Sequence, residues 1–386
     1  MGIVWKILGE GGGSTLTRSE GGSQCAQGGT RCARDSSVRS SPGRDVPEQA
    51  HPRIVAWPRF LTLALALLLA FAACEPPDQP PALVGGLPTT AAAYLDPDRV
   101  SAFQLEEGVV YRSVRSGTKP WRVHLLEVDV GRCEVGFRVV RAAEAEGRIP
   151  VSEMARRSEP GVIAAVNGDF FTPEDLPLGV EVSEGVLRGR TSRPVFAWRP
   201  GYVPWVGPIE WDGDSIHLGT WATSQSRPAP DLQVVAGFPS LLTDGRTVGD
   251  LQQGERPEFA GERHPRTAIG FDPVRSRIWI AVVDGRREGV SEGMSLPELA
   301  GLFRALGVRN AINLDGGGSS VMVIRSEPVS RPSDPAGQRP VVNALVVRHD
   351  PTYCGAVNAL DSTEPEVRVD AVPVAPDSES QGMVVQ

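Results

Sequence analysis

The sequence predicts an α+β domain: a mixed β-sheet with flanking helices that contains one parallel β-α-β unit. Three observations support this prediction. Short apolar stretches with the alternation typical of β-strands recur through the body of the chain. The chain has 43 glycines and 34 prolines in 386 residues, a composition that favours many turns and few long helices. One well-capped helical segment lies between two apolar strands near residue 300.

Composition also divides the chain into segments. The first is rich in Gly and Ser and has no apolar periodicity, which indicates a disordered leader. We interpret this leader as the result of a start assigned too early, with Val55 as an alternative start. The predicted boundaries are 1–54 for the leader, 55–74 for a signal peptide, 75–99 for a Pro/Gly-rich linker, 100–350 for a single folded domain, and 351–386 for an acidic disordered tail.

The signal segment reads RIVAWPRFLTLALALLLAFAAC, a basic flank followed by an apolar run that ends in small residues before Cys74. This order resembles a bacterial lipoprotein signal, in which Cys74 would be lipidated and become the mature N-terminus. Phe71 departs from the leucine usual in such signals. The sequence therefore predicts an exported lipoprotein anchored to the membrane of the cell envelope, with a transmembrane anchor and simple secretion as alternatives.

Charge excludes one class of partner. Residues 1–73 hold 8 of the 39 basic and 5 of the 47 acidic residues, so the rest of the chain has a net charge of −11. Lys119 is the only lysine after the signal. Without a basic field, nucleic acid is not an expected partner, and an anion in a site must be held by arginine or by backbone N–H groups.

Two cysteines, Cys133 and Cys354, remain after the leader and the lipidation site are set aside. In an exported domain, a pair of cysteines favours a disulfide. Two buried free thiols are the alternative.

Several elements can be placed within the body. Residues 121–130 and 134–142 alternate around a short GRC turn and predict a hairpin. VSEMARRS (151–158) predicts a short helix, and the apolar run GVIAAVN (161–167) predicts a buried strand. Residues 186–260 contain strands and turns whose order the pattern does not resolve.

The clearest unit is the predicted β-α-β. RIWIAVVD (277–284) is a strand, a helix follows with Ser295 as N-cap and Gly307 as its stop, and NAINLD (310–315) is the next strand. Parallel strands joined by a crossover end at the same edge of a sheet, where ligands bind. Asp284 and Asp315 end these two strands, so we expect both carboxylates at one edge.

The stretch NLDGGGSS places three glycines and two serines directly behind Asp315. Successive glycines can curl so that several N–H groups point at one anion. We therefore expect a backbone nest for phosphate made by Gly316, Gly317, Gly318 and Ser319, with a tight turn between strands as the alternative. No GK[ST] follows, so the loop is not a nucleotide P-loop.

Other polar residues follow the same pattern at strand ends. Arg266, which a proline precedes, is a candidate for bidentate contact with phosphate or carboxylate, and His264 could exchange a proton near neutrality. VNGDFF ends a buried strand and adds Asn167 and a third carboxylate, Asp169. Arg286 stands two residues beyond Asp284 as a second anion ligand.

Some chemistries are excluded. The histidines 51, 124, 217, 264 and 349 lack zinc-ligand spacing, and no G-x-S-x-G or EF-hand motif is present. The carboxylates could still hold Ca²⁺ or Mg²⁺, although no cofactor is required by the pattern.

Taken in order, these segments resemble the phosphodiester glycosidase family. The matching pieces are AAVNGDFF (164–171), GFPSLLTDGR (237–246), HPRTAIG (264–270), VVDGR (282–286), GMSLPELAGLFRALG (293–307), NLDGGGSS (313–320) and RPVVNALVV (339–347). The resemblance covers most of the folded body, about 160–348, and adds Arg339 and Asn343 to the candidate site.

This resemblance implies hydrolysis of the bond between the anomeric carbon of a sugar and a phosphodiester, with a phosphorylated glycan or sugar phosphate as substrate. Asp315, Asp284 and Asp169 would supply the catalytic carboxylates, and the arginines and the glycine loop would hold phosphate. Two alternatives remain: a metal-assisted phosphodiesterase that cleaves the P–O bond, and an envelope module that binds anionic glycans without catalysis.

Overall fold

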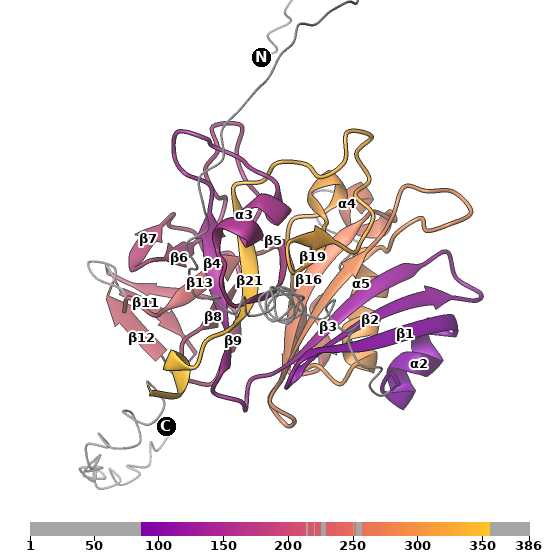
Figure 1. Cartoon of the computed structure of the whole chain (residues 1–386), viewed down its shortest axis with the longest axis horizontal. Helices are drawn as coiled ribbons and strands as arrows, with labels where there is room; N and C mark the ends of the chain where they lie inside the picture. Colours follow the sequence, from indigo (N-terminus) through magenta and orange to yellow (C-terminus); the bar gives the residue numbers. More distant parts are fainter. Residues whose placement is uncertain are drawn as a thin grey trace, which may run out of the picture. The chain divides into compact units, whose positions relative to one another are not determined.

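The computed structural model describes residues 86–213, 215–219, 221–224, 229–249, 251 and 257–355. This part of the chain is built mainly from β-strands in several sheets, with few helices (Figure 1). The leader, the signal segment with Cys74, and the tail beyond 355 lie outside the described residues. Ordered structure begins before the expected boundary at 100, because helix α2 (Thr89–Leu95) and the start of β1 lie inside the expected linker.

The largest sheet has eight strands in the order β1-β2-β3-β17-β16-β18-β14-β15. Their bounds are β1 Pro97–Glu106, β2 Val109–Ser116, β3 Arg122–Asp129, β14 Ser240–Thr243, β15 Arg246–Thr247, β16 Arg266–Asp272, β17 Arg277–Val283 and β18 Asn310–Asn313.

The predicted parallel pair is wrong in one respect. β17 and β18 run in the same direction, but β16 lies between them and pairs antiparallel with both. The reason is local: β16 and β17 form a hairpin in which Asp272 pairs with Arg277. β17 therefore has β16 on one side and β3 on the other, and β18 pairs with the free edge of β16. Every strand pairing in the described ranges is antiparallel, and the sheet is therefore not mixed. The ends of β17 and β18 still lie at the same edge.

A five-stranded sheet, β20-β19-β5-β21-β4, packs against the first. Its strands are β4 Val135–Arg141, β5 Val162–Asn167, β19 Met322–Ile324, β20 Glu327–Pro328 and β21 Asn343–His349. The predicted hairpin of residues 121–130 and 134–142 is wrong, because β3 pairs with β2 and β17 whereas β4 pairs with β21. The chain crosses between sheets there, since each strand buries its apolar face in the core between the two sheets.

That core contains side chains from both sheets, among them Leu126 and Ile280 from the larger sheet and Phe137 and Leu345 from the smaller. Further sheets extend it. One has the order β7-β6-β13-β8-β9 and another β10-β11-β12. Their bounds are β6 Glu181–Ser183, β7 Val186–Arg188, β8 Val195–Trp198, β9 Trp205–Gly207, β10 Glu210–Asp212, β11 Ser215–Leu218, β12 Trp221–Ser224 and β13 Gln233–Ala236.

Helices cover the outer faces. α5 (Leu296–Ala305) packs with α2 on the far side of the eight-stranded sheet, and α3 (Val151–Arg157) packs on the outer face of β5 and β21 (Figure 1). The predicted start of α5 is confirmed: the Ser295 side chain and Glu298 form a capping box. Gly307 ends the helical segment with φ +85°. A short helix α4 (Pro257–Gly261) and a 3₁₀ turn η1 (Gly317–Ser319) complete the described helices.

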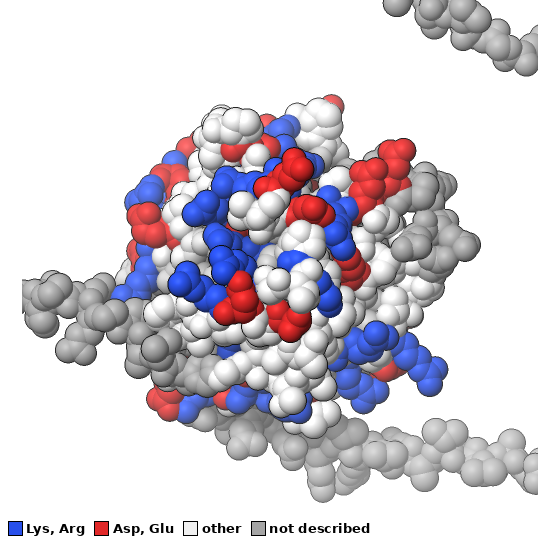
Figure 2. All heavy atoms as spheres, turned by 90° about the vertical axis from the view of Figure 1, so that its right-hand side faces the viewer, with Lys and Arg blue, Asp and Glu red and all other residues white. Residues whose placement is uncertain are grey.

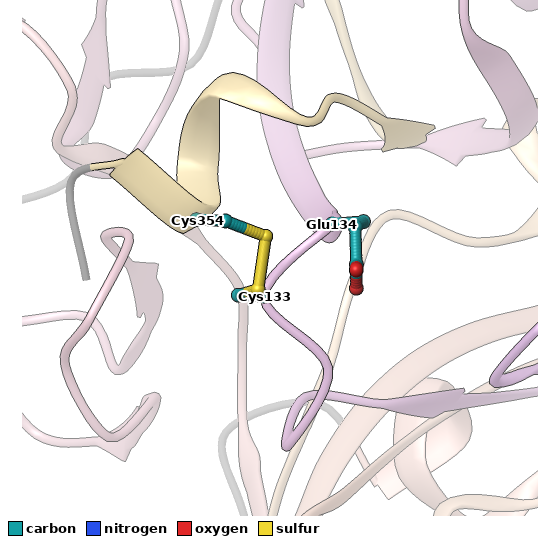
Figure 3. Close-up of side chains that lie close together, drawn as sticks. All are labelled: Cys133, Glu134 and Cys354. Atoms are coloured by element: carbon teal, nitrogen blue, oxygen red, sulfur yellow. A yellow bond between two sulfur atoms is a disulfide. The ribbon is translucent and has the colours of Figure 1, made fainter. Parts of the chain in front are cut away.

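The predicted disulfide is confirmed. Cys133 and Cys354 are linked, and Figure 3 shows the bond joining the turn before β4 to the short helical turn after β21. Within the described ranges, Cys133, Glu134 and Cys354 are also the only group of three side chains close enough to share a metal ion. Both sulfur atoms are already used by the disulfide, so we do not interpret the group as a metal site.

Two surface properties bear on partners. On the face shown in Figure 2, basic and acidic side chains lie interspersed. Among the described residues, no helix is both long and apolar enough to cross a membrane.

Candidate active site

Two strand ends from different sheets meet at the candidate site. β5 ends at Asn167 and β18 ends at Asn313, and the two loops that follow are hydrogen-bonded to each other. The amide of Asp315 donates to the carbonyl of Gly168 at 3.1 Å, and Asn167 Nδ2 donates to the carbonyl of Asp315 at 2.7 Å. The two motifs VNGD and NLDGGG, almost 150 residues apart in sequence, therefore form one unit.

Asn167 fixes this junction. It is fully buried, and its Oδ1 accepts hydrogen bonds from Thr267 Oγ1 at 2.7 Å and from the amide of Val321 at 3.2 Å. Because its polar atoms are bonded to the protein, we assign Asn167 to positioning. The sequence prediction of a substrate ligand does not fit this geometry.

Asp169 is 3% exposed. Its Oδ2 accepts a hydrogen bond from the amide of Gly179 at 2.6 Å, whereas its Oδ1 is buried without a partner in the structure. Burial raises the pKa of Asp169 to about 7, and the nearby Asp315 carboxyl adds to the rise, against the lowering effects of the Gly179 amide and Arg193. A carboxyl with such a pKa can gain or lose a proton near neutrality.

Asp315 is the second carboxyl of the pair. Burial raises its pKa to about 6, and Ser319, the Gly316 amide and Arg339 lower it in part. The Gly316 amide donates to Asp315 Oδ1 at 2.8 Å. Ser319 Oγ lies beside the carboxylate, although no hydrogen bond of normal geometry joins them. The two aspartates interact electrostatically, so their titrations are coupled.

Several buried polar atoms around this pair have no hydrogen-bond partner. They are Asp169 Oδ1, Asn313 Oδ1, Ser319 Oγ and Ser320 Oγ. Buried polar atoms in proteins are nearly always bonded, and an unpaired one costs roughly 1–3 kcal/mol. Four such atoms in neighbouring loops indicate a place where a polar ligand completes the hydrogen bonding.

The glycine loop does not form the predicted nest. The amides of Gly316 and Gly317 donate to Asp315 Oδ1 and to the carbonyl of Pro265, and those of Ser319 and Ser320 donate to carbonyls within the loop. The loop folds on itself as a 3₁₀ turn instead of directing these four amides at an external anion.

The glycines serve close approach. Gly317 has φ +62°, a conformation that side chains disfavour, and a Cβ there would lie 3.0 Å from Arg286 Nη2. A Cβ on Gly318 would collide with the guanidinium of Arg339 and with Asp334. The absence of side chains thus lets two arginines lie directly against the loop.

These two arginines are the cations nearest the loop. Arg286 is exposed and has φ +58°. Arg339 is 41% exposed and forms an ion pair with Asp334 at 2.9 Å. Guanidinium groups bind phosphate oxygens bidentately, so both remain candidates for the anion contact predicted from the sequence.

His264 lies close to the same cations. Its Nε2 is 3.7 Å from Glu262, and burial, followed by Arg266 and Arg286, lowers the pKa of His264. The imidazole is therefore biased toward its neutral form, in which it both donates and accepts hydrogen bonds.

The structure gives Arg266 a different role from the predicted one. It is 1% exposed, and its Nε and Nη2 donate to the carbonyls of Met294, Phe259 and Glu262. Burial, followed by Arg286, lowers the pKa of Arg266 to about 10. The guanidinium ties α4 and the loop before α5 to β16, so we assign it to positioning.

Asp284 is likewise not part of the carboxyl pair. One oxygen accepts from the amide of Arg331 at 2.8 Å, and the other lies 3.4 Å from Nε2 of the buried His124. His124 Nδ1 in turn contacts Tyr111 Oη at 2.7 Å. The strand end does reach the expected edge, but its side chain turns toward β3.

Asn343 and Glu181 form a hydrogen-bonded chain that holds the main chain of Asp169 in place. Asn343 Oδ1 accepts from the amide of Asp169 at 3.0 Å, and its Nδ2 donates to Glu181 Oε2 at 2.6 Å. Glu181 is fully buried between Arg141 and Arg188, at 3.4 and 3.3 Å. Asn343, expected as a substrate ligand, is therefore a positioning residue. Glu181 was not singled out from the sequence, because it lies in β6, a strand of three residues (Glu181–Ser183) that carries little periodicity.

A pair of buried carboxyls with raised pKa, next to arginines that can hold an anion, is a site typical of enzymes that cleave glycosidic bonds. Residues 160–348 match the family model described as phosphodiester glycosidase. The domain that these residues build belongs to the phosphodiester glycosidase family.

Two curated relatives are mammalian N-acetylglucosamine-1-phosphodiester alpha-N-acetylglucosaminidases. The human protein is 37% identical over 115 residues and the mouse protein 32% identical over 115 residues; each match covers 27% of this chain and 22% of the relative. A prophage-derived uncharacterized protein of Bacillus subtilis (strain 168), YomE, is 27% identical over 218 residues, which cover 52% of this chain and 30% of the relative. The match thus spans about a fifth to a third of the length of these relatives.

One solved structure supports the fold. A hypothetical protein from Synechocystis superposes with a TM-score of 0.52 and 19% identity, covering 66% of this chain and 64% of that chain. The zebrafish N-acetylglucosamine-1-phosphodiester alpha-N-acetylglucosaminidase catalytic domain gives a TM-score of 0.49 with 23% identity, covering 65% and 82%.

Proposed function

We propose that the protein hydrolyses glycosyl-1-phosphodiesters of envelope or extracellular glycans by cleaving the bond between sugar C1 and the phosphate oxygen. One observation carries this proposal: the carboxyls of Asp169, which is buried, and Asp315, which is half-buried, interact and both have a raised pKa, and an oxygen of Asp169 has no partner. In a member of this family, that pair is the place where the anomeric carbon would lie.

The two carboxyls divide the chemistry. One of the two acts as the base for water or as the nucleophile at C1, and the other protonates the departing oxygen. Both pKa values are raised, to about 6 for Asp315 and about 7 for Asp169, so each carboxyl can gain or lose a proton near neutrality. The C1–O bond breaks, water supplies the new hydroxyl on C1, and the products are a free sugar and a phosphomonoester.

The arginines stabilise the leaving group. Arg286 and Arg339 lie against Gly317 and Gly318, and the Ser319 and Ser320 hydroxyls are buried and unpaired. Together they would bind phosphate oxygens whose charge increases as the C1–O bond breaks, which lowers the barrier electrostatically. Phosphate is itself a good leaving group, so proton donation contributes less than it would for an alkyl glycoside.

Hydrolysis in ¹⁸O-enriched water tests the proposal. N-acetylglucosamine-1-phosphodiesters would be incubated with the protein and with its Asp315→Asn variant, and the products analysed by mass spectrometry. Label on the sugar, with activity lost in the variant, supports C1–O cleavage. Label on the phosphate contradicts it and supports the phosphodiesterase alternative, and the reaction would then be repeated with chelator and with added Ca²⁺ or Mg²⁺. Binding without turnover supports a glycan-binding module.

We also propose that the protein is exported and anchored to the cell envelope by a lipid on Cys74. The argument is the apolar segment that ends in small residues before this cysteine. Metabolic labelling with palmitate should label the protein and not its Cys74→Ala variant. Labelling of both, or of neither, contradicts the proposed anchor.

A further inference from the structure

A pocket of about 750 Å³ adjoins the candidate active site. Its walls include Phe170, Leu178, Phe238, Phe259 and Leu296, with Arg193 as the charged side chain among them. Phe238 is 47% exposed, and its ring faces the Arg193 guanidinium. The pocket is thus apolar, open and lined by three aromatic rings.

The pocket is held in fixed relation to the carboxyl pair. Phe170 directly follows Asp169 in the chain. The main chain of Phe238 forms two hydrogen bonds with Asn313: its amide donates to the Asn313 carbonyl at 2.7 Å, and its carbonyl accepts from Asn313 Nδ2 at 2.8 Å. Asn313 stands two residues before Asp315, so the segments that carry both aspartates are connected directly to the pocket wall.

Arg193 marks the polar end of the pocket. Its guanidinium lies over the rings of Phe170 and Phe238, at 5.6 and 5.3 Å, and its charge lowers the pKa of Asp169. An apolar group attached to the phosphate would lie against the three rings, and Arg193 would add a further positive charge to those of Arg286 and Arg339 that hold the phosphate.

A sugar suits these walls less well than an apolar group. One face of a sugar could stack on a ring, but the hydroxyls at its edges would lose hydrogen bonds to water without replacement. An alkyl chain or an aromatic ring loses nothing polar on entry, and each methylene removed from water improves binding about three- to fourfold.

We propose that this pocket binds the alcohol part of the phosphodiester, and that the preferred leaving group is a phosphate ester of an apolar alcohol, either alkyl or aromatic. The inference rests on the proposed function, because it takes the phosphate to lie between the carboxyl pair and the pocket. It adds a substrate class, a sugar linked through phosphate to an apolar chain.

The first test is a substrate series with one sugar and varied alcohols: methyl, glyceryl, butyl, octyl and benzyl. We expect kcat/KM to rise from glyceryl to octyl on the order of tenfold to a hundredfold, with benzyl also favoured. Phe238→Ala should remove most of this rise while leaving the methyl substrate nearly unchanged. Phe171→Ala is the matched control, because that ring packs on another cluster, near Arg148.

The second test needs no turnover. Octyl phosphate and glycerol phosphate, analogues of the departing product, would be titrated calorimetrically into the protein and its Phe238→Ala variant, with thermal melts to confirm folding. Tighter binding of octyl phosphate, lost in Phe238→Ala, supports the inference even if no substrate is cleaved. Equal affinity for the two phosphates overturns it, and so does hydrolysis that is indifferent to the alcohol. Failure of the proposed function would instead appear as absence of C1–O cleavage across the whole series.

Discussion

Asp315 and Asp284 look alike in the sequence and differ in the structure. Each follows a strand of the eight-stranded sheet and is followed by glycine; Asp284 is buried and Asp315 is half-buried. Asp284 has a protein partner on each oxygen, the Arg331 amide and His124. Around the Asp315–Asp169 pair, an Asp169 oxygen and neighbouring serine hydroxyls are unpaired. We therefore assign Asp284, whose oxygens are both bonded, to stabilising the fold. The Asp315–Asp169 pair, around which polar atoms are unpaired, is the candidate for ligand binding.

The largest expected effect is on catalysis at the pair. Asp315→Asn and Asp169→Asn should each lower kcat by about 10²–10⁴-fold, the usual contribution of a positioned acid or base. Thermal melts should show folded protein in both cases. Activity within tenfold of the parent in either variant would remove that aspartate from the mechanism.

Asp284→Ala should instead lower stability and leave catalysis nearly unchanged. Removing the carboxylate leaves the Arg331 amide and His124 unpaired in the interior, which should lower the free energy of unfolding by about 2–4 kcal/mol. Well below the melting temperature, kcat should change only a fewfold. Urea denaturation measures the first quantity and initial rates the second; a large loss of kcat in a stable Asp284→Ala protein would return this residue to the chemistry.

The comparison also predicts a pH dependence of stability. Asp169 has a pKa raised from 3.8 to about 7, so between these values the folded protein binds a proton that the unfolded chain has released. The free energy of unfolding therefore falls as pH rises through that window. Asp169→Asn should be nearly equal in stability to the parent at pH 4 and more stable than it at pH 8, by roughly 4 kcal/mol, because a difference of one pKa unit corresponds to about 1.36 kcal/mol. A difference that does not vary with pH would show that Asp169 is not desolvated as described.

The smallest expected effect concerns the glycine loop. Gly317→Ala places a side chain at φ +62° and near Arg286, and should lower stability by about 1 kcal/mol. Displacing Arg286 should also weaken phosphate binding, measured by titration with an apolar phosphate ester. Gly245→Ala is a control for the backbone term, since Gly245 has φ +78° with open space around it. Equal effects of both variants on phosphate binding would argue against a role for Arg286.

The sequence predicted the elements better than their arrangement. α5 was predictable with its cap and its stop because capping is local chemistry, and the β5 strand was predictable because it is continuously apolar. The pairing of the strands was not predictable, because β16 and β18 could each have paired with β17, and no local pattern decides between them. The switch of sheets between β3 and β4 likewise depends on which core each strand's apolar face joins.

For the site, strand ends and residue types were enough to bring together Asp169, Asp315 and the glycine loop. They did not reveal which atoms would already be bonded. Arg266, Asn167 and Asn343 have the chemistry of substrate ligands, yet their partners are carbonyls and amides from distant segments that no local pattern identifies. Glu181 and Arg193 were also missed: Glu181 lies in the three-residue strand β6 and Arg193 in the segment between β7 and β8, and neither position belongs to a periodic pattern.

The two hydrogen bonds between Asn313 and the main chain of residue 238 have a consequence for divergence within the family. The main chain at 238 is held at both its amide and its carbonyl, while the ring itself is half in solvent. Mutations at this position can therefore change the shape of the pocket without moving the strand that carries the catalytic loop. Residue 238 is therefore the first position to randomise in order to change the specificity for the alcohol part of the substrate. It is also the first position to compare when related chains are grouped by substrate.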